Sequence, residues 1–209
     1  MSEEAHIRVL SVDDHPLLRE GLTAIINNQP DMLLVAEASN TQEALLQFRK
    51  HHPDITLMDL RLPGQSGIDA MIELRREFPE ARVIMLTTYD GDVQVLRALK
   101  AGARAYLLKN LLRKELLETI RAVHAGKKTL SPEVSYQLAE HATDDALTPA
   151  EIDVLRLIAA GNANKQIADQ LSITEETVKG RVKNILSKLG ANDRTHAAMI
   201  GLKRGIIEF

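Results

Sequence analysis

The chain has 209 residues, enough for one or two domains, and its content of 44% hydrophobic and 26% charged residues is typical of a globular protein. Because it has no cysteine and no apolar run of the roughly 18 residues that a membrane helix needs, we expect no disulfides, no thiolate metal site, a cytoplasmic location and no membrane partner. The net charge of −3 argues weakly against nucleic-acid binding, and the aromatic content of 3% argues against stacking of single-stranded bases.

Residues 7–125 alternate strand-like and helix-like segments. Short apolar runs predict five strands, at 7–12, 33–36, 55–58, 83–86 and 105–108. Apolar residues at helical spacing predict five helices, at 16–28, 41–50, 68–78, 93–101 and 112–125. This alternation is typical of an α/β fold with a parallel sheet covered by helices on both faces.

The pattern changes after about residue 127. Residues 127–146 are polar and mixed, with one possible helix near 133–142, and we expect a linker there. From residue 147 onward the chain predicts a small all-α domain, in which Thr148 and Glu151 match a capping box at the start of the first helix. We therefore expect one domain at residues 1–126 and a second at residues 147–209.

Polar side chains stand at the ends of four predicted strands: Asp13 with Asp14, Asp59, Thr87 and Lys109. Because the carboxyl ends of parallel strands meet at one edge of a sheet, we expect these side chains to converge. Three carboxylates repel one another unless a divalent cation lies among them, and oxygen ligands suit Mg²⁺. A lysine and a hydroxyl beside them fit a phosphoryl group, with a carboxylate as the nucleophile. Each residue taken singly is more simply explained as a turn or a helix cap, and only the combination favours a site.

These residues lie in motifs that resemble the receiver domain of two-component response regulators. The matching segments are VLSVDDHP at 9–16, LMDLRLP at 57–63, LT at 86–87 and AYLLK at 105–109, within a resemblance that covers about residues 5–126. It implies a doubly wound five-stranded parallel sheet of order 2-1-3-4-5 and phosphorylation of Asp59 by a histidine kinase.

The resemblance also implies a role for individual residues. The Mg²⁺ ligands would be Asp14, Asp59 and the backbone carbonyl of Arg61, with Asp13 acting through water. The residues that bind the phosphoryl group and transmit the switch would be Thr87, Lys109 and Tyr106, of which the tyrosine would turn inward on activation.

One residue of this region departs from the family pattern, and two others bear on how fast the phosphoryl group is lost. Receivers usually have proline after the lysine, whereas this chain has Asn110, which leaves the isomer of that peptide open. Arg61 and Tyr89 are bulky and flank the expected path of a hydrolytic water, so we expect slow loss of the phosphoryl group.

A basic amphipathic helix is predicted in the second domain. Residues 177–192 contain four cations and no anion, and they follow a short helix at 165–171 and a tight turn at 172–173. Two helices joined so closely are typical of a helix-turn-helix, whose second helix enters the major groove. The alternative is a solvated basic face on an ordinary core helix.

Residues 145–207 resemble the LuxR-type DNA-binding domain, through LTPAEIDVL at 147–155, IAAG at 158–161, NKQIA at 164–168 and TVK at 177–179. The resemblance implies that Lys179 and Lys183 reach base edges in double-stranded DNA. It implies phosphate contacts for Lys165, Thr174, Thr177, Arg181 and Lys188. Gly180 departs from the pattern, since glycine inside a helix costs about 1 kcal/mol relative to alanine and offers no side chain to read bases. The last helix would form a dimer contact or pack on its own core.

Together the two halves predict a DNA-binding transcription regulator that forms a homodimer when phosphorylated and is not a turnover enzyme. An aspartyl-phosphate phosphatase and a module controlled by a partner protein stay open as alternatives. The distribution of charge fits two domains with different partners. Residues 1–146 contain 17 basic and 22 acidic residues and are acidic overall, whereas residues 147–209 contain 9 basic and 7 acidic residues and are basic overall.

Overall fold

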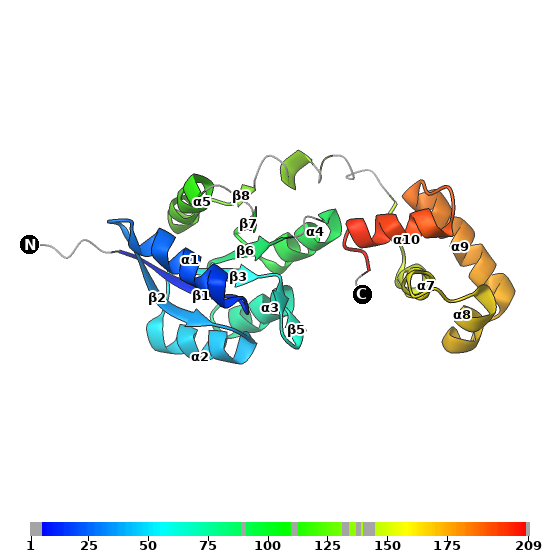
Figure 1. Cartoon of the computed structure of the whole chain (residues 1–209), viewed down its shortest axis with the longest axis horizontal. Helices are drawn as coiled ribbons and strands as arrows, with labels where there is room; N and C mark the ends of the chain where they lie inside the picture. The colour runs from blue at the N-terminus through cyan, green and yellow to red at the C-terminus, as the bar shows by residue number, and fades with distance from the viewer. Residues whose placement is uncertain are drawn as a thin grey trace, which may run out of the picture. The chain divides into compact units, whose positions relative to one another are not determined.

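The structure, a computed structural model, describes residues 6–88, 91–109, 113–130, 134–136, 139 and 145–207 (Figure 1). The chain divides into two compact units, one containing residues 1–89 and 95–135 and the other residues 90–94 and 136–209. The expected domain limits at 126 and 147 stay predictions. None of the helices in the described part of the chain has the length and apolar character of a membrane span.

The first unit is built on a parallel sheet with the strand order β2-β1-β3-β6-β7-β8. Its strands are β1 (Ile7–Val12), β2 (Met32–Ala38), β3 (Ile55–Asp59), β6 (Val83–Thr87), β7 (Ala105–Leu108) and β8 (Thr129–Leu130). The α/β fold class is confirmed, and the first five strands of this sheet have the predicted order. Strands β3 and β6 are buried along their whole length, as expected for strands that helices cover on both faces.

The sheet has six strands rather than the five that were expected. The sixth strand, β8, lies within the segment predicted as a linker, and it pairs in parallel with Ala105 and Tyr106 of β7. A small antiparallel hairpin of β4 (Arg61–Leu62) and β5 (Gln65–Ser66) follows β3. Strands of two residues show neither alternation nor an apolar run, so hydrophobic periodicity does not detect them.

All five helices predicted between residues 16 and 125 are present. They are α1 (Pro16–Asn27), α2 (Thr41–His51), α3 (Gly67–Glu77), α4 (Asp92–Ala101) and α5 (Arg113–His124). Local signals set their ends. The Asn40 side chain accepts the N–H of Glu43 at the start of α2, and Gly102 has a φ of 103° directly after α4, a conformation that favours glycine.

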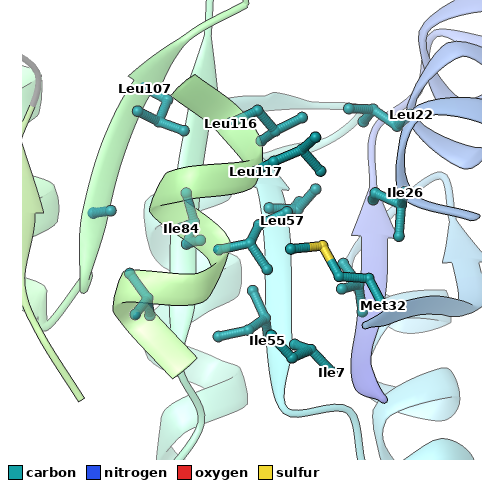
Figure 2. Close-up of a cluster of buried hydrophobic side chains, with 14 of the residues drawn as sticks. Ile7, Leu22, Ile26, Met32, Ile55, Leu57, Ile84, Leu107, Leu116 and Leu117 are labelled. Atoms are coloured by element: carbon teal, nitrogen blue, oxygen red, sulfur yellow. The ribbon is translucent and has the colours of Figure 1, made fainter. Parts of the chain in front are cut away.

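One hydrophobic core of this unit lies where α1 and α5 pack on a face of the sheet (Figure 2). Leu22 and Ile26 of α1 and Leu116 and Leu117 of α5 surround Leu57 of β3, and each is at most 7% exposed. Burial of each such side chain contributes about 1.5–3 kcal/mol. This packing holds β1 and β3 side by side, and it thereby positions the polar residues at their carboxyl ends.

The second unit contains α7 (Pro149–Ala159), α8 (Asn164–Leu171), α9 (Glu175–Leu189) and α10 (Arg194–Lys203) (Figure 1). The predicted capping box is present: the N–H of Glu151 donates to Thr148 Oγ1 at 3.3 Å, and the N–H of Thr148 donates to Glu151 Oε2 at 2.8 Å. The core of this unit includes Val154, Leu155, Ile158, Ile167, Val178, Ile185 and Ala197. Most of the helix expected near residues 133–142 lies outside the described residues.

Candidate functional site

An acidic site lies beyond the carboxyl ends of β1 and β3. Asp13 directly follows β1 and Asp59 is the last residue of β3, and the register pairs Val12 with Met58 just before them. The side chains of Asp13 and Asp59 are only 1% and 4% exposed. Asp14, the next residue along the chain, is exposed. The structure therefore brings the adjacent carboxylates of Asp13 and Asp14 together with that of Asp59, which is distant in the sequence.

Lys109 lies between the two buried carboxylates. Its Nζ is 2.6 Å from Asp13 Oδ2 and 2.8 Å from Asp59 Oδ2. The backbone N–H of Lys109 donates to the carbonyl of Thr87 at 2.6 Å, which joins the end of β7 to the end of β6. One ammonium group thus compensates two buried anions, and the site as a whole is negative.

The surroundings of Asp59 shift its pKa upward. Burial raises the pKa of Asp59, the Lys109 ammonium group acts in the opposite direction, and the Asp13 carboxylate raises that pKa further. The N–H of Arg61 donates to Asp59 Oδ1 at 3.3 Å. A buried carboxylate beside a like charge favours the binding of further positive charge.

The acidic site fits a divalent metal ion. Asp13, Asp14, His15 and Asp59 each offer one ligand atom, and all four atoms lie within 4.8 Å of one another. Among the described residues, Asp13 Oδ2 and Asp59 Oδ2 are buried and make ion pairs with Lys109 but no well-oriented hydrogen bond. Carboxylate oxygens that are buried and short of hydrogen bonds can accept a cation at little cost.

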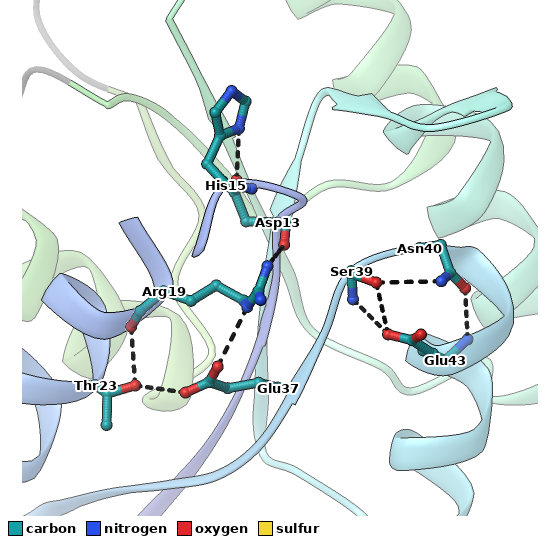
Figure 3. Close-up of polar contacts among 8 residues, drawn as sticks. All are labelled: Asp13, His15, Arg19, Thr23, Glu37, Ser39, Asn40 and Glu43. Atoms are coloured by element: carbon teal, nitrogen blue, oxygen red, sulfur yellow. Dashed lines mark hydrogen bonds and ion pairs between the residues drawn. The ribbon is translucent and has the colours of Figure 1, made fainter. Parts of the chain in front are cut away.

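His15 also belongs to this site. It is the N-cap residue of α1, but its side chain makes no capping hydrogen bond. Its Nδ1 lies 3.0 Å from Asp13 Oδ1 and 2.9 Å from Asp14 Oδ1, and Figure 3 shows the contact with Asp13. The position of His15 directly after the acidic pair is the signal in the sequence that could have pointed to it.

Two of the three residues expected to bind the phosphoryl group and transmit the switch, Thr87 and Tyr106, lie on neighbouring strands. Thr87 ends β6 and is 2% exposed, and Tyr106 of β7 is completely buried. The tyrosine therefore faces inward in this structure. Tyr89, Asn110 and the peptide between Lys109 and Asn110 lie outside the described residues.

Helices α8 and α9 form a helix-turn-helix. Ser172 has a φ of 53° and reverses the chain after α8, and Thr174 Oγ1 accepts the N–H of Thr177 at 3.2 Å to cap α9. Val178 and Ile185 of α9 are completely buried, whereas Lys179 and Lys183 are exposed. The apolar face of α9 thus packs inward, and its lysines face solvent.

Most of the residues that were expected to contact DNA are exposed. The exposed ones are Lys165, Thr174, Thr177, Lys179 and Lys183, and the half-buried ones are Arg181 and Lys188. The Lys188 ammonium group is already engaged, since its Nζ lies 2.9 Å from Glu151 Oε2 and 3.2 Å from the carbonyl of Ala146. Lys188 therefore ties α9 to the start of α7.

The carboxylate at this contact is stabilised in its charged form. Burial acts to raise the pKa of Glu151, but hydrogen bonds from Thr148 and Lys188 outweigh it and hold that pKa below its usual value. The capping box and the ion pair of Lys188 share this one carboxylate.

Helix α10 contributes to the core of its own unit. Ala197 is completely buried, and Leu202 packs against the same core, as does Ile206 just after the helix. Met199 is 64% exposed, so one large apolar side chain of α10 faces outward. A dimer contact through this helix stays a prediction.

Comparisons with known proteins match both units. Residues 9–121 match the response regulator receiver domain, and residues 145–200 match the luxR family of bacterial regulatory proteins. The response regulator protein VraR of Staphylococcus aureus is 35% identical over 207 residues, which cover 97% of this chain and 99% of VraR.

Solved structures of full-length regulators are also similar. The response regulator ChrA of a heme-sensing two-component system is 35% identical, with 97% of this chain and 100% of ChrA covered and a TM-score of 0.58. RcsB from Salmonella enterica serovar Typhimurium, bound to promoter P1flhDC in the presence of phosphomimetic beryllofluoride, is 26% identical, with 93% and 97% covered and a TM-score of 0.74. This chain therefore belongs to the two-component response regulators that combine a receiver domain with a LuxR-type DNA-binding domain.

Proposed function

We propose that a histidine kinase activates this regulator by phosphorylating Asp59 in the presence of Mg²⁺. The observation that carries the proposal is the burial of the Asp59 carboxylate beside Lys109 and the acidic pair, at the carboxyl end of β3. The residues that would hold the ion are Asp14, Asp59 and the carbonyl of Arg61, with Asp13 acting through water. Oxygen ligands of this kind match the preference of Mg²⁺.

In the transfer step, a carboxylate oxygen of Asp59 attacks the phosphorus of the kinase phosphohistidine. The P–N bond breaks, and the leaving imidazole takes up a proton. The Lys109 ammonium group and the Thr87 hydroxyl bind oxygens of the transferred group and stabilise its charge. Bound Mg²⁺ supplies further positive charge against the phosphoryl oxygens. Hydrolysis of the aspartyl phosphate resets the site, so the chain is a phosphoacceptor and not a turnover enzyme.

The phosphoryl group then changes the first unit through a small number of residues. Recruitment of Thr87 toward the new charge alters the space beside Tyr106, and the face formed by α4, β7 and α5 takes a second arrangement. This second arrangement controls the formation of a homodimer in the cytoplasm.

The dimer presents two copies of α9 to double-stranded DNA, at half-sites about one helical turn apart. Lys179 and Lys183 reach base edges in the major groove. The phosphate contacts come from Lys165, Thr174, Thr177, Arg181 and Lys188. Of these residues, Lys188 must first exchange its ion pair with Glu151 for a phosphate.

The test compares DNA binding and oligomeric state with and without beryllofluoride and Mg²⁺. We expect dimerisation and tighter DNA binding in the wild-type chain, and neither response in Asp59→Asn. A response that persists in this variant would favour a module controlled by a partner protein. Multiple turnover of a phosphomonoester would favour a phosphatase.

A further inference from the structure

The acidic site contains a nitrogen donor beside its oxygen donors. The His15 Nδ1 atom is 3.0 Å from Asp13 Oδ1 and 2.9 Å from Asp14 Oδ1 (Figure 3 shows the first contact). The same group of potential ligand atoms includes Asp59, and all of its members lie within 4.8 Å of one another. An imidazole so close to three carboxylates can share a bound cation with them.

The backbone keeps this imidazole at the site. The N–H of His15 donates to Asp13 Oδ1 at 2.8 Å, and Pro16 begins α1 immediately afterwards. The ring of Pro16 clashes with helical conformations of the residue before it, so the backbone of His15 is restricted to the extended conformation that it adopts. The ring itself is 66% exposed, and it can reorient around a cation without disturbing the core.

Imidazole and carboxylate ligands differ in the metals that they favour. Mg²⁺ binds oxygen ligands and keeps several waters, so an imidazole adds little to its affinity. Co²⁺, Ni²⁺ and Zn²⁺ bind imidazole well, and they bind mixed nitrogen and oxygen sites more tightly than the earlier divalent metals do. A nitrogen donor at this position therefore strengthens binding of the later metals selectively.

We propose that His15 is a ligand for late first-row divalent cations at the phosphorylation site, and that it sets the metal preference of this site. The proposal rests on the proposed metal site around Asp59. Because the chain has no cysteine, thiolate sites do not compete for these cations. A late metal held by His15 and the carboxylates excludes Mg²⁺ from the same position, so the metal present decides how readily the site is loaded for phosphorylation.

The experiment measures the binding of Mg²⁺ and Co²⁺ to the full chain by calorimetry, with the visible absorption of Co²⁺ as a signature of its ligands. The variant His15→Phe keeps an aromatic ring but removes both ring nitrogens. The matched control is His6→Phe, an exposed histidine at the opposite end of β1, about 20 Å away at 3.3 Å per strand residue. The variant Asp59→Asn tests whether the cations bind at the phosphorylation site.

We expect His15→Phe to weaken Co²⁺ binding about 10-fold or more, in line with the loss of a group that supports a metal site, and to change the Co²⁺ absorption. Its Mg²⁺ affinity should change less than about twofold, because Mg²⁺ makes little use of imidazole. His6→Phe should change neither affinity.

Wild-type Co²⁺ affinity in His15→Phe would overturn the proposal. An equal change for Co²⁺ and Mg²⁺ would overturn it as well, because the ring would then only shield or shape the carboxylates. If Asp59→Asn leaves both affinities unchanged, the proposed metal site itself is wrong. If Asp59→Asn lowers both affinities while His15→Phe lowers neither, only the role of His15 is wrong.

Discussion

A Cβ atom on residue 67 would lie 1.8 Å from the carbonyl oxygen of Asp59, so Gly67 is the residue that allows α3 to begin directly against the end of β3. The N–H of Gly67 also donates to the carbonyl of Leu60 at 2.8 Å. The requirement for glycine here is one of space and not of φ, because any side chain would displace the backbone of Asp59.

Gly67→Ala should therefore lower the free energy of unfolding by about 1–3 kcal/mol, the typical effect of overpacking. It should also slow phosphorylation by acetyl phosphate, because the Asp59 carboxylate moves. Gly21→Ala in α1 is the matched control. A Cβ at residue 21 meets nothing within 4 Å, so we expect a gain of about 0.5–1 kcal/mol. Urea denaturation measures the free energy of unfolding of both variants. Wild-type stability in Gly67→Ala would contradict the steric argument.

Lys109→Met should strongly destabilise the metal-free protein. The Lys109 ammonium group lies within 2.8 Å of both Asp13 and Asp59, and its removal leaves two buried carboxylates facing each other. We expect a loss of about 3–5 kcal/mol in the presence of a chelator. Added Mg²⁺ should restore part of that loss.

The control for this variant is Lys114→Met. Lys114 is 83% exposed and makes an ion pair of 3.7 Å with Glu118, so its loss should change stability by less than about 1 kcal/mol. Urea denaturation with chelator and with Mg²⁺ compares the two variants. Equal effects of both substitutions would show that the buried ion pairs are not important for stability.

Arg61→Ala should speed the loss of the phosphoryl group several-fold. Arg61 is exposed, lies two residues after Asp59 and donates its N–H to that carboxylate. Removing the long side chain opens a path for the attacking water. The decay of the radiolabelled aspartyl phosphate measures the rate, with Arg76→Ala, an exposed change on α3, as the control. An unchanged decay rate would exclude Arg61 as a barrier.

Lys183→Ala and Lys188→Met should separate DNA contact from stability. Lys183 is exposed on α9, and its loss should weaken DNA binding by about 1–3 kcal/mol. Lys188 makes the ion pair with Glu151, so its loss should mainly lower the stability of the helical unit. Binding isotherms at several salt concentrations and hydrogen exchange test the pair. Unchanged exchange in Lys188→Met would contradict the structural role of the ion pair, and an unchanged salt dependence would contradict the phosphate contact proposed for Lys188.

Glu151→Gln should have an effect that depends on pH. Burial opposes the charge, but hydrogen bonds from Thr148 and Lys188 lower the pKa of Glu151 below its ordinary 4.5. The charged form therefore contributes stability above pH 4.5, and this contribution is lost as the pH falls through the lower pKa of the folded state. The cost of the substitution should be about 1.5–3 kcal/mol at pH 7.

This cost should shrink as the pH falls below 4.5 and through the lowered pKa of Glu151, because the wild-type carboxyl group is then protonated. Hydrogen exchange of residues 147–209, corrected for the intrinsic rates, compares the wild-type chain with Glu151→Gln at pH 7 and at a pH below 4.5. A difference that stays constant with pH would contradict the assignment to the Glu151 charge.

The sequence by itself determined the order of the main elements and the two-part organisation, because hydrophobic periodicity and capping signals act over a few residues. Thr148 and Glu151 cap α7 as their spacing predicts, and Asp13 and Asp59 follow apolar runs that become neighbouring strands. The short strand β8 escaped prediction because two residues carry no period.

Only the tertiary structure decided which side chains meet. Lys188 of α9 contacts Glu151 of α7, although the two residues are 37 positions apart. Gly67 lies against the carbonyl of Asp59 because the chain turns back after β3. The position of Asp59 near Asp13 and His15 likewise depends on the pairing of β1 with β3. Such contacts are set by the packing of separate elements, and local sequence patterns do not predict that packing.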